Sequence, residues 1–259
     1  MRIATFNVNS VRSRLHILER WIPEFQPDML FMQETKTTDA SFPASFFSEL
    51  GYKSYYHGEK MYNGVAVAVK NYEKNCDVEV TYGFEDGEYA TRVMMLRHDD
   101  ITILNTYVPQ GKEMMHPDFE MKKEFLSRVR EVIERNINSS FMWLGDLNVA
   151  PEAIDVTHPE NKKKHVCFCE EIRNIFSDTK RGLIDILRKF KPSERIYTFY
   201  DYRVKDAMKR GIGWRIDHML ATPELAEYAI SCSPDIRVRE WDKPSDHVPL
   251  TGVYNVRKT

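Results

Sequence analysis

Short runs of apolar and β-branched residues alternate along the chain with longer runs in which apolar residues recur every three or four positions. A short uninterrupted apolar run is typical of a strand buried on both faces, and the wider spacing is typical of an amphipathic helix. The expected strands are residues 3–8, 29–32, 64–69, 101–108, 141–144, 216–221 and 250–254. The expected helices are residues 11–21, ending near Pro23, then 119–137, 172–180 and 183–190, with Gly182 as a break between the last two.

This order of elements favours mixed α and β structure in one domain, residues 1–259. We find no internal repeat, no Pro- or Gly/Ser-rich linker and no low-complexity tract in the sequence. The strands meander too much for a single doubly wound parallel sheet. Two packed sheets flanked by helices fit the pattern better.

Composition narrows the class of protein. With 42% apolar and 12% aromatic residues among 259, the chain can bury a sizeable core, which excludes a disordered protein and a low-complexity filament. No run approaches the roughly 20 apolar residues that span a bilayer, and the first residues carry no secretory signal. Four cysteines are too few for a disulfide framework, so we expect a reduced, cytoplasmic setting and read Cys76 and Cys232 as core residues. A net charge of −2 argues against general nucleic-acid binding but permits a local basic face.

Polar residues gather where the expected strands end, a common position for binding groups. Alone, Asn-x-Asn or Gly-Asp-x-Asn is more often a turn, and Ser-Asp-His is more often a loop or helix cap. Their joint occurrence favours a site, and their oxygen atoms suit Mg²⁺ or Mn²⁺. No combination of Cys and His has comparable zinc spacing. The candidate oxygen ligands are Asn7, Glu34, Asp146, Asn148 and Asp246.

The same motifs, in the same order, resemble those of the exonuclease III family. They are Phe-Asn-Val-Asn-Ser, Gln-Glu-Thr-Lys, Asn-Thr-Tyr-Val-Pro-Gln-Gly, Gly-Asp-Leu-Asn-Val-Ala-Pro, Gly-Trp-Arg-Ile-Asp and Pro-Ser-Asp-His. Members of that family are Mg²⁺-dependent apurinic/apyrimidinic endonucleases and 3′-exonucleases of the endonuclease–exonuclease–phosphatase superfamily. The resemblance implies a four-layered αββα sandwich of two facing mixed sheets. It also implies cleavage of double-stranded DNA 5′ to abasic sites and from 3′ ends.

The resemblance further implies roles for particular residues. Glu34 would be the principal Mg²⁺ ligand, and Asp146 would activate the attacking water or protonate the leaving group. His247 would face the phosphoryl oxygens, oriented by Asp217. The implied metal group is Asn7, Glu34, Asp146, Asn148, Asp246 and His247. The implied catalytic group is Tyr107, which would contact the scissile phosphate, Asn148, which would hold the water or phosphate, and Asp146, Asp217 and His247.

A DNA-facing surface is expected from basic residues near aromatic ones, because cationic side chains neutralise backbone phosphates. The basic candidates are Arg12, Arg14, Lys205, Lys209 and Arg215. By resemblance, Phe199, Trp214 and Ile216 would line the pocket for a flipped-out abasic sugar. The run Lys162 to Lys164 is interpreted as a solvated loop.

Two residues depart from the family pattern. Ser10 stands where the family more often has glycine, and we expect an altered turn after Asn9. His218 stands where an apolar or aromatic residue is common. A surface or half-buried histidine is the expectation there, and the alternatives are a phosphate contact or an effect on the Asp217–His247 pair.

Two other functions remain open at this point. One is a phosphoesterase acting on phospholipid or inositol phosphate headgroups, against which stand the basic and aromatic residues around Trp214. The other is a non-catalytic DNA-binding module, although every expected catalytic residue type is present. For the nuclease we expect a monomer that has no membrane partner.

Overall fold

Two six-stranded sheets face each other in the computed structural model, which describes residues 1–71 and 78–255. The first sheet has the order β11-β12-β1-β2-β4-β3 and the second the order β5-β6-β7-β8-β10-β9. The first contains β1 (Arg2–Asn7), β2 (Met29–Gln33), β3 (Tyr52–His57), β4 (Val65–Lys70), β11 (Ala229–Pro234) and β12 (Leu250–Tyr254). The second contains β5 (Val78–Tyr82), β6 (Val93–His98), β7 (Ile101–Tyr107), β8 (Ser140–Asp146), β9 (Ile184–Asp185) and β10 (Asp217–Ala221).

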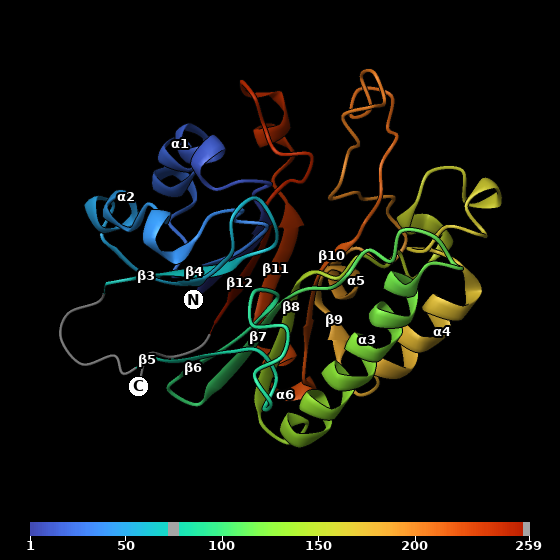
Figure 1. Cartoon of the computed structure of the whole chain (residues 1–259), viewed down its shortest axis with the longest axis horizontal. Helices are drawn as coiled ribbons and strands as arrows, with labels where there is room; N and C mark the ends of the chain where they lie inside the picture. The colour runs from blue at the N-terminus through green and yellow to red at the C-terminus, as the bar shows by residue number, and fades with distance from the viewer. Residues whose placement is uncertain (72–77, 256–259) are drawn as a thin grey trace.

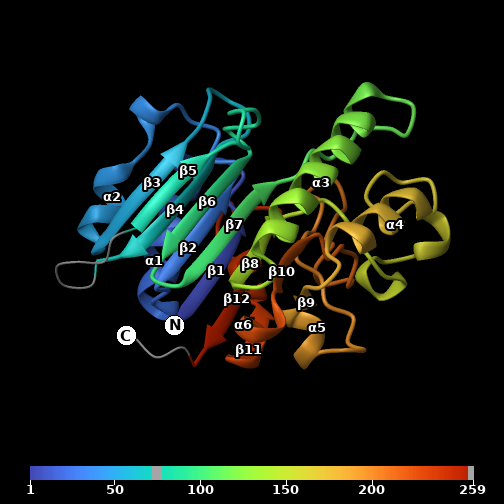
Figure 2. The same ribbon diagram turned by 90° about the horizontal axis from the view of Figure 1, so that it is seen from below.

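Helices cover the outer face of each sheet, and Figures 1 and 2 show the layers. The first sheet packs against α1 (Leu15–Phe25) and α2 (Ala44–Glu49), and the second against α3 (Pro117–Asn136) and α4 (Glu170–Thr179). The short helices α5 (Ile186–Phe190) and α6 (Pro223–Glu227) lie near β11, β10 and β8. The architecture is the expected αββα sandwich. No helix within residues 1–71 and 78–255 has the length and apolar character needed to cross a membrane.

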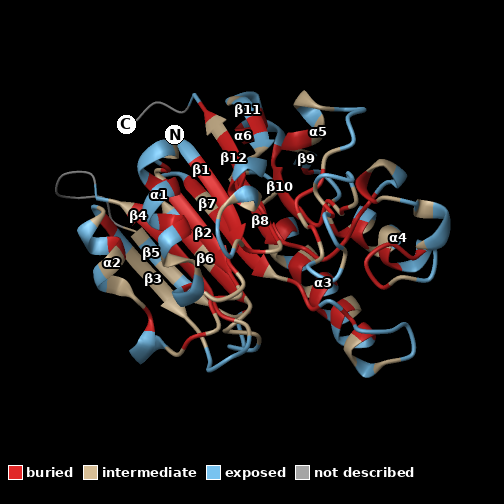
Figure 3. Cartoon of the chain, turned by 90° about the horizontal axis from the view of Figure 1, so that it is seen from above, coloured by how far each residue is buried: buried red, intermediate tan, exposed pale blue. Residues whose placement is uncertain are grey.

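The central strands are apolar along their whole length because both of their faces are covered. In β1, Ile3 lies in the core between the two sheets, whereas Ala4 and Phe6 lie in the core beneath α1. Figure 3 shows the result, with buried strands inside and the exposed surfaces of the helices outside. Two rigid sheets therefore hold the segments that follow the strand ends.

Some sequence expectations need correction. The helix expected to end near Pro23 continues through it to Phe25, because a proline in the last turn removes only one helical hydrogen bond. Gln26 then ends the helix in the left-handed conformation, with its N–H bonded to the Ile22 carbonyl. Residues 183–190 are not all helical, since β9 precedes α5. Five of the described strands, β3, β5, β6, β9 and β11, were not expected.

The strand directions bring the candidate residues to one edge of both sheets. β1 is parallel to β2, and β7 is parallel to β8, so the carboxyl ends of all four point the same way. β12 runs antiparallel to β1, and β10 runs antiparallel to β8, so these two strands begin at that same edge. The segments that follow β1, β2, β7 and β8 and those that precede β10 and β12 therefore meet at one edge of the two sheets, which we call the rim.

Candidate active site

Two carboxylates from different sheets, the half-buried Glu34 and the buried Asp146, lie close together at this rim. The Asn7 side-chain amide donates to Glu34 Oε1 at 2.8 Å and to Asp146 Oδ2 at 2.9 Å, and so bridges the two. Gly145 helps to place Asp146 beside Tyr107, because a Cβ at Gly145 would lie 2.1 Å from the Thr106 carbonyl oxygen of β7. Only glycine allows β7 and β8 to approach this closely there.

The acidic group has the chemistry of a divalent metal site. Glu34, Asp146 and His247 offer ligand atoms that all lie within 4.8 Å of one another. Burial would raise the pKa of Glu34, but the Lys36 ammonium 2.7 Å from Oε2 and the Asn7 amide outweigh burial and lower it. Glu34 is therefore ionised at neutral pH, as a hard cation requires. Asp246 lines the same cavity and accepts a hydrogen bond from the Asn9 side chain at 3.0 Å.

His247 is held by one aspartate and faces another. Its Nδ1 lies 2.8 Å from Asp217 Oδ2, and its Nε2 lies 3.7 Å from Asp146 Oδ2. Burial lowers the pKa of His247, but the charges of Asp217 and Asp146 outweigh it and raise the pKa to about 10. Burial in turn raises the pKa of Asp146, and His247 opposes that shift. An imidazolium has no free lone pair for a metal, so the two carboxylates are the better ligands and His247 is a cation facing the cavity.

Tyr107 and Asn148 complete the floor of the site. Burial and the neighbouring carboxylate Glu34 raise the pKa of Tyr107 well above the ordinary value, so its phenol stays protonated and can donate a hydrogen bond. Arg92 packs over its ring at 4.6 Å. The side-chain nitrogen of Asn148 donates to the Val108 carbonyl at 2.9 Å, which fixes the amide in the cavity wall.

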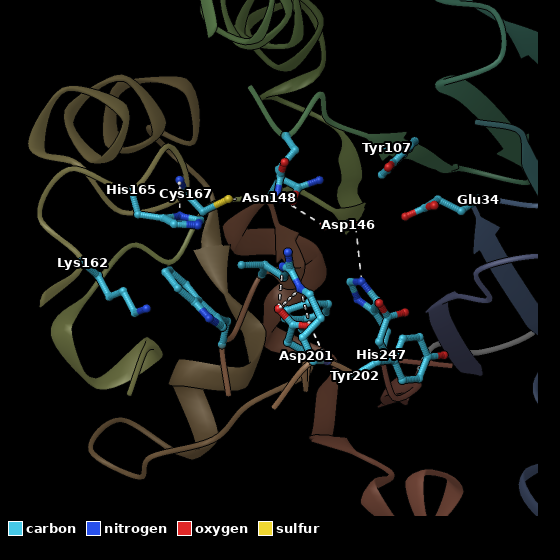
Figure 4. A pocket seen from close by; sticks show the side chains of 16 residues that line it. Glu34, Tyr107, Asp146, Asn148, Lys162, His165, Cys167, Asp201, Tyr202 and His247 are labelled. Atoms are coloured by element: carbon cyan, nitrogen blue, oxygen red, sulfur yellow. Dashed lines mark hydrogen bonds and ion pairs between the residues drawn. The ribbon is translucent and has the colours of Figure 1, made fainter. Parts of the chain in front are cut away.

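These groups open into a cavity of about 590 Å³, and Figure 4 shows Glu34 and Tyr107 on one side of it and Lys162 and His165 on the other. Phe199, Trp214 and Ile216 also line this cavity. The ring centres of Trp214 and His165 are 4.5 Å apart, and the Lys162 ammonium lies 5.6 Å from the centre of the Trp214 ring. The interpretation of the basic run as a solvated loop is therefore wrong for Lys162, although Lys163 and Lys164 are exposed.

The expected DNA-facing cations do not all lie where a phosphate could reach them. Arg12, Lys205 and Lys209 are exposed outside the main cavity, and Arg14 donates to Tyr202 Oη, which lines it. Arg215 contradicts the expectation. Its guanidinium is 1% exposed and binds Asp155 through Nε and Nη2, at 2.6 and 3.0 Å, and Asp185 through Nη1 at 2.7 Å. A side chain buried in two ion pairs cannot contact DNA.

Comparison with known proteins agrees with this geometry. Residues 4–247 match the model of the Endonuclease/Exonuclease/phosphatase family. The chain belongs to this family. It is 32% identical to exodeoxyribonuclease III of Haemophilus influenzae, over 98% of the chain and 100% of that relative.

Two solved structures of the family share the whole fold. An AP endonuclease from Archaeoglobus fulgidus is 45% identical with a TM-score of 0.93, over 99% of this chain and 100% of that one. A 3′ phosphatase from Neisseria, bound to product DNA hairpin, is 29% identical with a TM-score of 0.92, again over 99% and 100%. The fold and the recognised family are thereby confirmed.

The two departures from the family pattern have local explanations. Asn9 and Ser10 both adopt positive φ, 43° and 84°, a region that favours glycine and costs a serine some strain. His218 is fully buried, so the expectation of an exposed or half-buried ring is wrong. Its Nδ1 faces the Arg215 guanidinium at 3.0 Å and its Nε2 the Val149 carbonyl at 2.8 Å, which makes it a neutral bridge behind the site.

Several residues at the site were given no role by the sequence. Lys36 lies beside the cavity, and its ammonium contacts Glu34 Oε2 and Asn9 Oδ1. Its position two residues after Glu34 was the available signal. The residues that line the cavity and had no predicted role are Gln110, Lys162, His165, Cys167, Asp201, Tyr202 and Arg203. Cys232 is buried as expected, and Cys76 lies outside the described residues.

Proposed function

We propose that this protein is a Mg²⁺-dependent DNA repair nuclease. It cleaves the phosphodiester bond 5′ to abasic sites and removes nucleotides from 3′ ends of double-stranded DNA. The observation that carries the proposal is the pairing of the Glu34 and Asp146 carboxylates with a charged His247 at the mouth of an aromatic-walled cavity. The similarity to an exodeoxyribonuclease III and to an AP endonuclease supports it.

The residues have complementary roles in phosphodiester hydrolysis. Negative charge develops on the phosphoryl and leaving oxygens, and preorganised positive groups stabilise it. His247, oriented by Asp217, supplies one such group, and the Tyr107 phenol donates a hydrogen bond to the phosphate. Asp146 takes a proton from the attacking water or delivers one to the leaving oxygen, and the Asn148 amide positions the water or the phosphate.

The metal is held by the acidic group. Glu34 is the principal ligand, with Asp146 as the second carboxylate and Asn7, Asn148 and Asp246 around them. When bound, Mg²⁺ supplies Lewis-acid stabilisation of the phosphoryl oxygen. His247 is assigned to the phosphate, not to the metal, because its ring is charged.

The substrate is double-stranded DNA with an abasic site or a 3′ end. Phe199, Trp214 and Ile216 form a wall of the cavity that receives a sugar without its base. Arg12, Arg14, Lys205 and Lys209 contact the backbone phosphates. We place the protein in the cytoplasm, where its free thiols Cys167, Cys169 and Cys232 stay reduced, and propose that it acts as a single-domain monomer.

Purified protein should be assayed with Mg²⁺ on four labelled substrates, of which the DNA duplexes are end-labelled. They are a duplex with one tetrahydrofuran abasic analogue, an intact blunt duplex, a duplex ending in a 3′ phosphate, and an inositol phosphate. We expect incision 5′ to the analogue and slower shortening from 3′ ends, both abolished by EDTA and restored by excess Mg²⁺. Glu34→Gln should need at least tenfold more Mg²⁺ for half-maximal rate.

Each other outcome contradicts part of the proposal. Hydrolysis of the inositol phosphate alone would support the phosphoesterase alternative. DNA binding without cleavage of any substrate would support the non-catalytic module. Cleavage at full rate in EDTA would remove the metal from the reaction.

A further inference from the structure

A lysine outside the cavity bonds three of the segments that build it. Lys122 lies on α3, its side chain is fully buried, and its Nζ donates to three backbone carbonyls. The acceptors are Gln110 at 3.0 Å, Asn148 at 2.7 Å and Val166 at 2.7 Å. An ammonium has three N–H donors, and each of the three is used by a different part of the chain.

Each acceptor belongs to a cavity-lining segment. Gln110 lies in the segment that follows Tyr107, and Asn148 lies two residues after Asp146. All four residues line the cavity. Val166 stands between His165 and Cys167, which both line the cavity. One ammonium thus bonds the backbone of three segments that line the cavity.

A packing role alone does not explain a charged residue in this place. Burying an ammonium is costly, and its partners here are three carbonyl dipoles and, at 4.0 Å, the Cys167 Sγ, with no carboxylate among its hydrogen-bond acceptors. A methionine would fill nearly the same volume without that cost. The charged group is useful here because its N–H donors hold the three carbonyls in one arrangement, whereas a thioether has no N–H to donate.

We propose that Lys122 is a positioning residue for the nuclease reaction: its ammonium sets the relative positions of the segments that carry Tyr107, Asp146 and Asn148. The inference rests on the proposed function and adds a residue that never touches the substrate. Displacement of a reacting group by about 1 Å can cost about 100-fold in rate. The phosphate-contacting residues Arg12, Lys205 and Lys209 lie elsewhere, so loss of Lys122 should lower kcat and leave KM nearly unchanged.

The first test compares Lys122→Met with Lys123→Met. Lys123 is the neighbouring lysine on the same helix, and its ammonium bonds Glu120 and Glu171 on the surface. Steady-state incision of the abasic analogue is measured well below the Tm of each variant. We expect Lys122→Met to lower kcat at least 100-fold with KM within threefold of wild type, and Lys123→Met to change neither constant by more than twofold.

The second test separates charge from volume and remains informative if the methionine variant does not fold. Lys122→Ala removes the part of the side chain beyond Cβ. The removed group corresponds to propylammonium. We expect propylammonium chloride to raise the kcat of Lys122→Ala at least tenfold and in a saturable manner. Neither 1-propanol nor tetramethylammonium chloride at equal concentration should do so.

The outcomes are distinct. Folded Lys122→Met with kcat within threefold of wild type would overturn the inference while leaving the proposed function intact. Equal rescue of Lys122→Ala by 1-propanol would also overturn it, because volume alone would then suffice. Wild-type protein that cleaves no DNA would overturn the proposed function itself.

Discussion

His247 is buried between two carboxylates, and the arrangement decides its charge. Asp217 Oδ2 accepts from Nδ1, while Asp146 lies on the side of Nε2. An isolated histidine, with a pKa near 6.5, would be mostly neutral in the cell. Because the two aspartates outweigh the effect of burial, the ring is a cation over the whole neutral range. Asp217 also orients the ring and leaves Nε2 as the donor toward the cavity.

From this pairing we predict that Asp217 and His247 act as one unit. Asp217→Asn and His247→Asn should each lower kcat by two or more orders of magnitude and change DNA affinity far less. The double variant should cost little more than the worse single variant, because either change removes the same oriented cation. Single-turnover kinetics and equilibrium binding with the abasic duplex would measure both quantities.

The chain offers a matched control in a second aspartate–histidine pair. Asp39 Oδ2 lies 2.9 Å from His57 Nδ1 at an exposed position, so Asp39→Asn should keep the wild-type rate. Additive losses in the Asp217 and His247 double variant would show that the two residues work independently.

The sequence predicted the site where residue type and motif order were sufficient. The positions of Glu34, Asp146 and His247 at one rim agree with the strand-end pattern, since parallel strands end at the same edge. Arg215 was misassigned because its neighbours Trp214 and Ile216 face the cavity. In an extended segment the residue between two such neighbours faces the other way, so Arg215 points into the interior. The alternation of side chains between the two faces of an extended segment was the signal that could have corrected the assignment of Arg215.

At the scale of elements, burial on both faces decided which strands were predicted. β4, with the sequence Val-Ala-Val-Ala-Val-Lys, lies inside the first sheet and is almost wholly apolar. The missed strands β3, β5 and β11 are at sheet edges or next to them, and they mix polar and apolar residues. An edge strand is stabilised by its neighbour and needs no continuous apolar run, so its sequence resembles that of a loop.

The segment before β10 depends on the buried Arg215 for its conformation. Arg215 joins Asp155, from the short helix Ala153–Asp155, to Asp185 of β9. We predict that Arg215→Met destabilises the protein by about 3 kcal/mol, because it leaves the half-buried Asp185 without its ion pair and the buried Asp155 with Arg188 alone. Urea unfolding would measure the change. Arg97→Met, which breaks the exposed pair with Glu79, should cost less than about 1 kcal/mol.

The same network gives a pH dependence whose sign follows from the shifts. Burial would raise the pKa of Asp155 and Asp185, but Arg215 outweighs it and lowers both. Their contribution to stability is therefore present above the ordinary aspartate pKa and is lost as the pH falls through the lower folded values. In Arg215→Met the buried carboxylates should instead bind protons readily. The stability gap to wild type should be largest near pH 7 and narrow toward pH 4. A constant gap over that range would contradict the assignment.

At the scale of the whole molecule, a slightly negative protein must present a positive face to DNA. Arg12 and Arg14 precede α1, whereas Lys205 and Lys209 lie on the long segment before β10 (Figure 1). The two groups come from opposite parts of the sequence, and the bond between Arg14 and Tyr202 connects them. The local distribution of charge, not the sum, determines the attraction.

We predict a steep salt dependence of binding to an abasic duplex. The slope of log K against log salt should be strongly negative, and Arg12→Ala, Lys205→Ala or Lys209→Ala should each reduce its magnitude by about 1. Fluorescence anisotropy with EDTA present, to prevent cleavage, would measure it. Lys53→Ala, on the edge strand β3, should leave the slope unchanged. A wild-type binding constant that does not change with salt concentration would contradict the proposed phosphate-contacting face.

The pairing of β1 with β12 has a consequence for biosynthesis. Ser245 donates to the Asn7 carbonyl across 238 positions of sequence, and the last strand lies directly against the first. A ribosome produces Asn7 and Glu34 long before His247 and the strand β12 that follows it. A nascent or prematurely terminated polypeptide thus carries the metal-binding half of the site without its cation. The group of residues at the rim is therefore complete only after β12 has paired with β1.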